Sequence, residues 1–179
     1  MKRLNSAHMH SQAMMMLYEE HAVILQRIQA FLQLLEAENL SAGKEELSRS
    51  INFFRNYGDK YHHQKEEDIL FSLLKDRYPA LTSIAEALEE HHEMFRGNLQ
   101  EAEAAMVAAD WESARKILRH YLSDLTDHIS AEDDELFVAV DEVLSEVEKE
   151  RLYFSFLDKD AELGEATKKA YEEQARQTA

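Results

Sequence analysis

Residues that form turns are scarce in this chain. It has 179 residues, but only four of them are glycine and one is proline. Tight turns between strands rely on these residue types, so their scarcity argues against an all-β or an α/β fold. Apolar side chains instead recur with the 3.6-residue period of an amphipathic helix, over four segments of roughly 30 residues each. Short connections between four such helices predict an all-α fold, an antiparallel up-down four-helix bundle.

Helix-capping residues mark the ends of these segments. The breaks fall at residues 39–43, 78–79, 108–110 and 143–145. Pro79 suits the first turn of a helix, where its missing N–H costs nothing. Asp110 is expected to cap the helix that follows it. Ser145 and Glu148 have the spacing of a capping box, which predicts one further helix at this point.

The chain after the fourth segment is expected to form a separate unit. An additional C-terminal helix runs from Glu146 to about Lys159 in this prediction, and a polar tail follows Gly164. The expected organisation is a bundle over residues 1–145 and a helical extension over residues 146–179, packed on the bundle or partly disordered. Exposed apolar residues on the extra helix would cover the bundle or form a dimer contact, so the chain is expected to be either a monomer or a homodimer.

The charge balance excludes some classes of partner. The chain has 36 acidic and 20 basic side chains, a formal net charge of −16. Nucleic acids and anionic membrane surfaces attract clustered Lys and Arg, so neither is an expected partner. No apolar run approaches the ~18 residues of a membrane span, and the first residues do not have the pattern of a targeting segment. A cytoplasmic protein is the expectation.

Two segments repeat one pattern of histidine and glutamate. The chain has nine histidines and no cysteine, which excludes thiolate metal sites and cysteine nucleophiles. His62 and Glu66 are four residues apart, and so are His128 and Glu132. Each pair is followed at the same spacing by leucine and phenylalanine: Leu70 and Phe71 after the first pair, Leu136 and Phe137 after the second.

The first and third helices share a different pattern around one histidine. Leu17, His21, Ile24 and Ile28 have the same spacing as Leu88, His92, Phe95 and Leu99. This match favours His92, rather than its neighbour His91, as the inward-facing histidine of the third helix.

Together these residues have the chemistry of a metal site. A histidine and a glutamate four residues apart lie on one face of a helix. Four imidazoles and two carboxylates inside a bundle form ligands for two metal ions, with bridging carboxylates and oxide, hydroxide or water completing the set. The predicted ligands are His21, His62, Glu66, His92, His128 and Glu132. Imidazole and carboxylate suit iron, manganese or zinc, and two bridged ions suit iron or manganese best.

The choice of ligands on the second helix stays open. His63 and Glu67 have the same spacing as His62 and Glu66. The downstream Leu and Phe match favours His62 and Glu66, whereas upstream Phe53 and Tyr57, set against Leu118 and Leu122, favour the other pair. Acidic runs like those around both glutamates are also typical of solvated helix faces.

The same residues resemble the hemerythrin-like, or HHE cation-binding, family. The resemblance covers about residues 10–145, and it rests on Glu20-His21, residues 62–71, Glu90-His91-His92-Glu93, residues 128–133 and Leu136-Phe137. It implies a non-haem di-iron centre bridged by two carboxylates. It also implies binding of, or reaction with, dioxygen, nitric oxide or hydrogen peroxide. The alternative is an iron- or oxygen-sensing or iron-storage module without turnover, so whether the protein is an enzyme stays open.

One departure from the oxygen-carrying hemerythrins concerns a fifth histidine. Those proteins have a second histidine four residues before the one on the third helix, where this chain has Leu88. The fifth imidazole is therefore missing unless His63 or His91 supplies it. Otherwise one ion has an additional open position or recruits Glu89 or Tyr18. An open position favours chemistry at the metal over reversible oxygen carriage.

Overall fold

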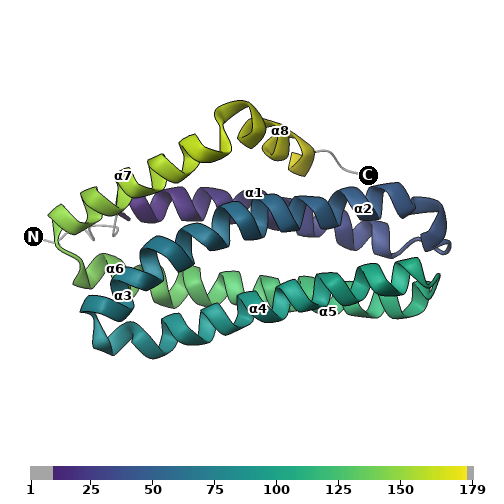
Figure 1. The fold of residues 1–179 in the computed structure, drawn as a ribbon, viewed down its shortest axis with the longest axis horizontal. Coiled ribbons are helices and arrows are strands. Elements are labelled where there is room, and N and C mark those ends of the chain that lie inside the picture. The colour runs from purple at the N-terminus through teal and green to yellow at the C-terminus, as the bar shows by residue number, and fades with distance from the viewer. Residues whose placement is uncertain (1–9, 177–179) are drawn as a thin grey trace, which may run out of the picture.

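The computed structural model describes residues 10–176, and this part of the chain is helical, without a strand (Figure 1). The predicted all-α class is confirmed. Residues 1–9 and 177–179, which the two predicted units include, lie outside the described part. Among the described helices, none has both the length and the apolar character needed to cross a bilayer.

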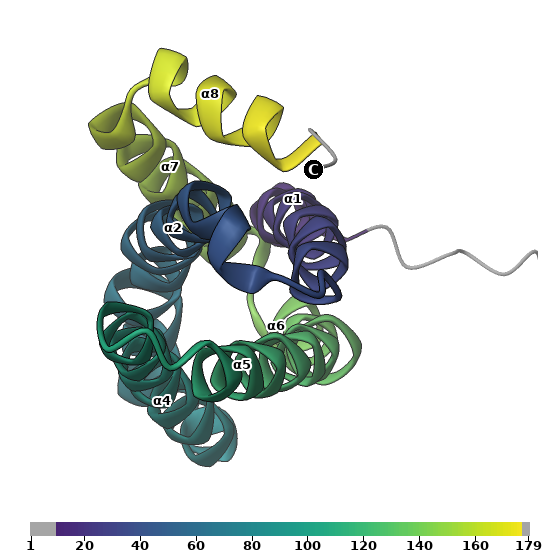
Figure 2. The same cartoon turned by 90° about the vertical axis from the view of Figure 1, so that its right-hand side faces the viewer.

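Four long helical rods lie side by side (Figures 1 and 2). The first is α1 (Gln12–Leu35), and a 3₁₀ turn, Leu40–Gly43, leads to the second. The second rod consists of α2 (Lys44–Phe53), the π-helical segments η2 (Phe54–His63) and η3 (Glu66–Phe71), and α3 (Ser72–Arg77). The third is α4 (Pro79–Val107), and the fourth consists of α5 (Trp111–Ala131), the π-helical segment η4 (Glu132–Leu136) and α6 (Phe137–Val143). The first rod contacts the second and the fourth, and α4 contacts the second rod and α5.

The helices begin where the capping residues predict. Pro79 occupies the first turn of α4. The Asp110 side chain accepts a hydrogen bond from the backbone N–H of Ser113 at 3.1 Å. Ser145 and Glu148 form both hydrogen bonds of a capping box at the start of α7. These caps satisfy backbone N–H groups that the first turn of a helix leaves without partners.

The Glu148 carboxylate makes this cap sensitive to acid. Hydrogen bonds from Ser145 and from the hydroxyl of Tyr78 lower the pKa of Glu148 to about 2, from an ordinary value of 4.5. A lowered pKa stabilises the fold above pH 4.5, and that contribution is lost as the pH falls toward 2. We expect Glu148→Gln to remove this part of the acid sensitivity, measured as a smaller fall in melting temperature between pH 5 and pH 3. An identical fall in both proteins would contradict the prediction.

Two further helices cover the outer side of the first two rods (Figure 2). These are α7 (Glu146–Leu163) and α8 (Glu165–Arg176), joined at Gly164, whose φ of 86° favours glycine. The helix α7 extends beyond the expected end near Lys159 because its backbone stays helical until this glycine. Phe156 is buried and Phe154 is exposed, so one face of α7 packs on the bundle.

The apolar core is divided into two clusters along the bundle. One contains Ile24, Tyr61, Phe95 and Leu125 and extends toward α2 and the beginning of α5. The other contains Leu17, Leu70, Leu88 and Leu136 and extends toward α3, α6 and α7. Each rod therefore passes from one cluster to the other near its middle, and the predicted ligands lie at this crossing.

The π-helical segments differ from the continuous α-helices that the 3.6-residue period predicts. Aromatic rings recur every four residues along η2: the ring centroids of Phe53 and Tyr57 are 5.2 Å apart, and so are those of Tyr57 and Tyr61. The Nζ atom of Lys65 lies 3.9 Å from the centroid of the Tyr61 ring. An α-helix has 3.6 residues per turn, so aromatic residues spaced every four residues would gradually move around it. The wider π turn keeps these residues on one face. Short π segments are frequent at functional sites.

Candidate metal centre

Seven buried side chains meet between the two apolar clusters. They form two groups, and within each group the potential ligand atoms all lie within 4.8 Å of one another. The two-imidazole group consists of His21, His62, Glu66 and Glu132, and the three-imidazole group consists of His63, Glu66, His92 and His128. The structure thus brings together all six residues predicted from the sequence, and His63 joins them.

The helix periodicity explains how each rod contributes. On α1, His21 lies between Leu17, which belongs to one apolar cluster, and Ile24, which belongs to the other. On α4, His92 has the same position between Leu88 and Phe95. The histidines therefore share a face with apolar core residues, and burial of that face carries them inward.

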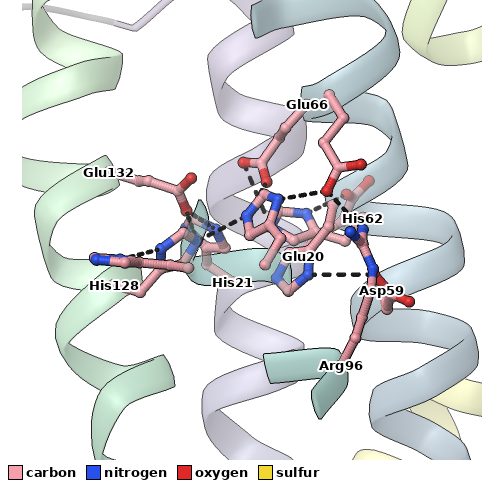
Figure 3. A network of polar contacts seen from close by, with 12 residues as sticks. Glu20, His21, Asp59, His62, Glu66, Arg96, His128 and Glu132 are labelled. Carbon is pink, nitrogen blue, oxygen red and sulfur yellow. Dashed lines mark hydrogen bonds and ion pairs between the residues drawn. The ribbon is translucent and has the colours of Figure 1, made fainter. Parts of the chain in front are cut away.

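The two glutamates each face both groups (Figure 3). For Glu66, one carboxylate oxygen lies 3.6 Å from Nε2 of His62, and the other lies 3.7 Å from Nε2 of His92. For Glu132, Oε2 lies 3.3 Å from Nε2 of His21 and 3.3 Å from Nε2 of His128. A carboxylate with an imidazole of each group beside it is placed to bridge two ions.

The other ring nitrogen of each histidine faces outward to a second side chain. Nδ1 of His21 is 2.7 Å from Asp133, Nδ1 of His62 is 2.9 Å from Glu20, and Nδ1 of His92 is 2.8 Å from Glu67. Nδ1 of His63 is 3.8 Å from Asp59, and Nδ1 of His128 is 3.4 Å from Nδ1 of His91. Carboxylates on Nδ1 fix the tautomer that leaves Nε2 free for a metal, and they raise the basicity of the ligand.

Several buried polar atoms at the centre lack hydrogen-bond partners among the described residues. They include Nε2 of His21, Nε2 of His62 and both carboxylate oxygens of Glu66 and Glu132. Leaving one such group buried without a partner costs about 1–3 kcal/mol, and more when it is charged. Six unpartnered atoms directed toward one another fit bound cations, which would supply the missing partners. The residues present therefore fit a metal centre.

The protonation states also suit metal binding. Burial and neighbouring imidazoles lower the pKa of His62 and of His92 well below its usual value, so both rings are neutral near pH 7. Burial also lowers the pKa of His63. Burial acts to lower the pKa of His21, but the hydrogen bond to Asp133 and the nearby charges of Glu132 and Asp133 outweigh it and raise the pKa to about 9. A metal ion at His21 would thus displace a proton, as is usual for ligand imidazoles.

The two carboxylates have opposite pKa shifts. Burial and the charge of Glu132 raise the pKa of Glu66 well above its usual value. Burial also acts to raise the pKa of Glu132, but His128 and His21 outweigh it and hold that pKa well below its usual value. Ligand oxygens of Glu66 and Glu132 lie within 4.8 Å of each other, so two negative charges there would repel. Cations between the two carboxylates would remove that repulsion.

Both adjacent histidines of the second rod contribute to the centre. His62 and His63 both point inward, one into each group. Of the two glutamates, Glu66 belongs to both groups, whereas half-buried Glu67 is bound by Arg96 at 2.6 Å and faces Nδ1 of His92. The sequence leaves the pairs His62/Glu66 and His63/Glu67 as alternatives, because adjacent residues of an α-helix point in different directions, and it allows His63 as one source of a fifth imidazole.

His91, Tyr18 and Glu89 lie outside both groups. His91 is exposed, as the register of the third helix predicts. Tyr18 donates its hydroxyl to the backbone carbonyl of Asp133, and Glu89 accepts a hydrogen bond from Lys75. The fifth imidazole at the centre is that of His63, so neither Tyr18 nor Glu89 is needed to complete the set.

Comparison with known proteins gives one match. A model of the hemerythrin HHE cation-binding domain matches residues 14–140, which is more than half of the chain. Comparisons with curated proteins and with solved structures returned no similar protein. The matched range contains all seven residues of the two groups. The chain therefore belongs to the hemerythrin HHE cation-binding domain family.

Proposed function

We propose that this protein holds two iron ions and binds or reacts with a small oxidant, namely dioxygen, nitric oxide or hydrogen peroxide. One ion would be held by the three-imidazole group and the other by the two-imidazole group. Glu66 and Glu132 would be shared between them, inside an antiparallel up-down four-helix bundle. The observation that carries the proposal is the position of these two carboxylates, each with an imidazole of either group within 3.7 Å.

The unequal number of imidazoles supports a binding position for a small molecule. Both ions would share Glu66 and Glu132, but the two-imidazole group supplies one imidazole fewer. Iron has a higher coordination number than this group offers, so an ion there retains a position for an exogenous ligand. Two bound iron ions supply redox chemistry for such a ligand, and no thiolate competes with imidazole and carboxylate in this chain.

The surrounding residues hold the ligands in place and exclude water. The ring of Phe137 stacks on that of His21, with centroids 5.4 Å apart, and Phe71 stacks on His92 at 5.8 Å. The apolar clusters on both sides keep bulk water away from the centre. A dry site strengthens the attraction between the cations and their carboxylates, and it favours diatomic or similarly small ligands over charged ones.

Metal analysis combined with optical spectroscopy tests the proposal. We expect the purified chain, reconstituted with ferrous iron without oxygen, to hold about two ions, and exposure to dioxygen to produce absorption bands of an oxidised di-iron centre. The variant His62→Ala/His128→Ala removes one imidazole from each group and should lose both the iron and the bands. A chain that takes up no iron under these conditions would overturn the proposal.

Repeated consumption of an added oxidant separates catalysis from binding. If the iron-loaded protein consumes many equivalents of hydrogen peroxide or nitric oxide, it is an enzyme. If it binds one equivalent and stops, it is a binding or sensing module. A specific feature favours sensing: side chains of α7 and α8 are connected to His62 through buried and half-buried ion pairs.

The role of His63 as a ligand can be tested against an exposed histidine of the fourth rod. We expect His63→Ala to weaken one ion, so that the iron content after gel filtration falls below two ions per chain, because the three-imidazole group would lose one of its ligands. His120→Ala is the control, since its exposed ring pairs with Asp124, which belongs to neither group, and it should keep both ions. Elemental analysis after gel filtration measures the content. Equal losses in both variants would contradict the assignment.

A further inference from the structure

A network of buried and half-buried charges connects one candidate ligand to the C-terminal helices. Nδ1 of His62 lies 2.9 Å from Oε2 of Glu20 on α1. The other oxygen of Glu20 accepts hydrogen bonds from Nζ of Lys65 at 2.5 Å and from the hydroxyl of Tyr61 at 3.0 Å. Glu20 is only 2 % exposed, so its charge depends on these partners.

Asp160 of α7 completes this network from outside the bundle. Its Oδ1 accepts hydrogen bonds from Lys65 at 2.7 Å and from Tyr61 at 2.6 Å. Its other oxygen accepts one from Lys168 of α8 at 2.6 Å. Burial acts to raise the pKa of Asp160, but the hydrogen bonds from Lys168, Lys65 and Tyr61 outweigh it and lower that pKa, so the group is an anion at pH 7.

Lys65 is the central member of the network. It is completely buried, and among the described residues its ammonium group pairs with two carboxylates, those of Glu20 and Asp160. A buried ammonium ion is stable only with close counter-charges. Without the Asp160 carboxylate, Glu20 alone would have to balance the charge of Lys65 while it also accepts the hydrogen bond from His62.

The family match ends at residue 140, before α7 and α8 begin. Asp160 and Lys168 thus belong to a part of the chain that the matched domain does not include. Their contacts extend inward as far as the carboxylate that orients a candidate ligand. The C-terminal helices therefore make polar contacts with the ligand network in addition to packing on the apolar surface of the bundle.

We propose that Asp160, acting through Lys65 and Tyr61, is a positioning residue for the metal centre, and that α7 and α8 thereby set the metal affinity of the two-imidazole group. The proposal rests on the proposed function, since it needs metal ions at the two groups. Asp160 and Glu20 together offset the charges of Lys65 and Lys168. This leaves the Glu20 carboxylate free to hold the proton on Nδ1 of His62 and to keep Nε2 as the donor.

The three-imidazole group gives an internal reference. Its histidines have other outward partners: Asp59 for His63, Glu67 for His92 and His91 for His128. None of these three belongs to the Asp160 network. A change at Asp160 should therefore weaken one ion more than the other, which general destabilisation of the fold would not do.

Anaerobic equilibrium dialysis of the metal-free, full-length chain against ferrous iron tests the proposal. We expect Asp160→Asn to bind one ion with wild-type affinity and the other about 10- to 100-fold more weakly, the usual loss when an outer partner of a metal ligand is removed. The amide cannot balance Lys65, so one positive charge remains beside the cation site. Asp160→Glu keeps the charge and should retain affinity close to that of the wild type.

Glu46→Gln is a matched control. The Glu46 carboxylate is half-buried and pairs with the buried guanidinium of Arg27 at 2.5 Å, so its loss also unbalances a buried cation, but away from the two groups. It should leave both affinities unchanged. Equal weakening of both ions in Asp160→Asn, or the same weakening in Glu46→Gln, would overturn the proposal, as would wild-type affinities in Asp160→Asn. A wild-type chain that binds no iron would instead overturn the proposed function, and this inference with it.

Hydrogen exchange gives a second measurement, whose first comparison uses the wild-type chain alone and so does not depend on a variant folding normally. Because coupling between two sites is reciprocal, iron binding should slow amide exchange in residues 146–176 of the wild-type chain. The slowing should persist in Glu46→Gln and be lost in Asp160→Asn. If iron slows exchange only in the four rods of the wild-type protein, the C-terminal helices are not coupled to the centre.

Discussion

Replacing Glu66 with leucine should abolish the uptake of both iron ions and at the same time stabilise the metal-free protein. Glu66 belongs to both groups, so each ion would lose a ligand and the two would lose a bridge. Its side chain is fully buried, and neither carboxylate oxygen has a hydrogen-bond partner among the described residues. A buried polar group without a hydrogen-bond partner costs about 1–3 kcal/mol, and leucine, an apolar residue of similar size, removes that cost.

Opposite effects on binding and on stability make this prediction specific. Elemental analysis after iron reconstitution should give about zero ions per chain, and urea unfolding of the metal-free variant should give a higher midpoint than that of the metal-free wild type. Asp68→Asn is the control: it is two residues away and exposed, and it should change neither quantity. A variant that retains iron, or one that is less stable without metal, would contradict the role given to Glu66.

Iron should raise the melting temperature of the wild-type chain strongly. A ligand at a thousand times its dissociation constant stabilises the native state by about 4 kcal/mol, so two ions would contribute about 8 kcal/mol. At about 2–4 °C per kcal/mol for a chain of this size, the shift is roughly 15–30 °C. The physical reason is the set of buried donor atoms that have no partners without a cation.

Calorimetry of the chelator-treated and the iron-loaded chain measures this shift. The variant His62→Ala/His128→Ala should melt at the same temperature with and without iron. A wild-type chain whose melting temperature does not respond to iron would show that the buried donor atoms are stabilised in another way.

Much of the fold could be predicted from the sequence because its causes are local. Amphipathic periodicity buries one face of each helix, and this alone selects His92 over His91. Pro79 and Asp110 begin helices because of the backbone groups next to them. His62 and Glu66, like His128 and Glu132, are four residues apart and so lie on one face of their rod. This spacing is local, and the repeat could be detected without coordinates.

The features that the sequence did not predict depend on distant contacts or on an uncommon backbone. His62 and His63 both enter the centre because the chain is π-helical from Phe54 to His63, whereas an α-helical period assigns adjacent residues to different faces. The contact between Lys65 and Asp160 spans 95 residues of sequence. Local spacing contains no information about such a pair, and each residue alone has the appearance of a surface charge.

The division of the core into two apolar clusters has a consequence for how cooperatively the protein unfolds. Between the clusters lies a layer of histidines and glutamates, which without metal contributes little attraction across the bundle. Each cluster is then a separate unit with its own stability, and the end of the bundle with the weaker unit can open first. Metal ions bound to ligands from all four rods would join the two units, and binding them would then determine whether this chain unfolds in one step or in two.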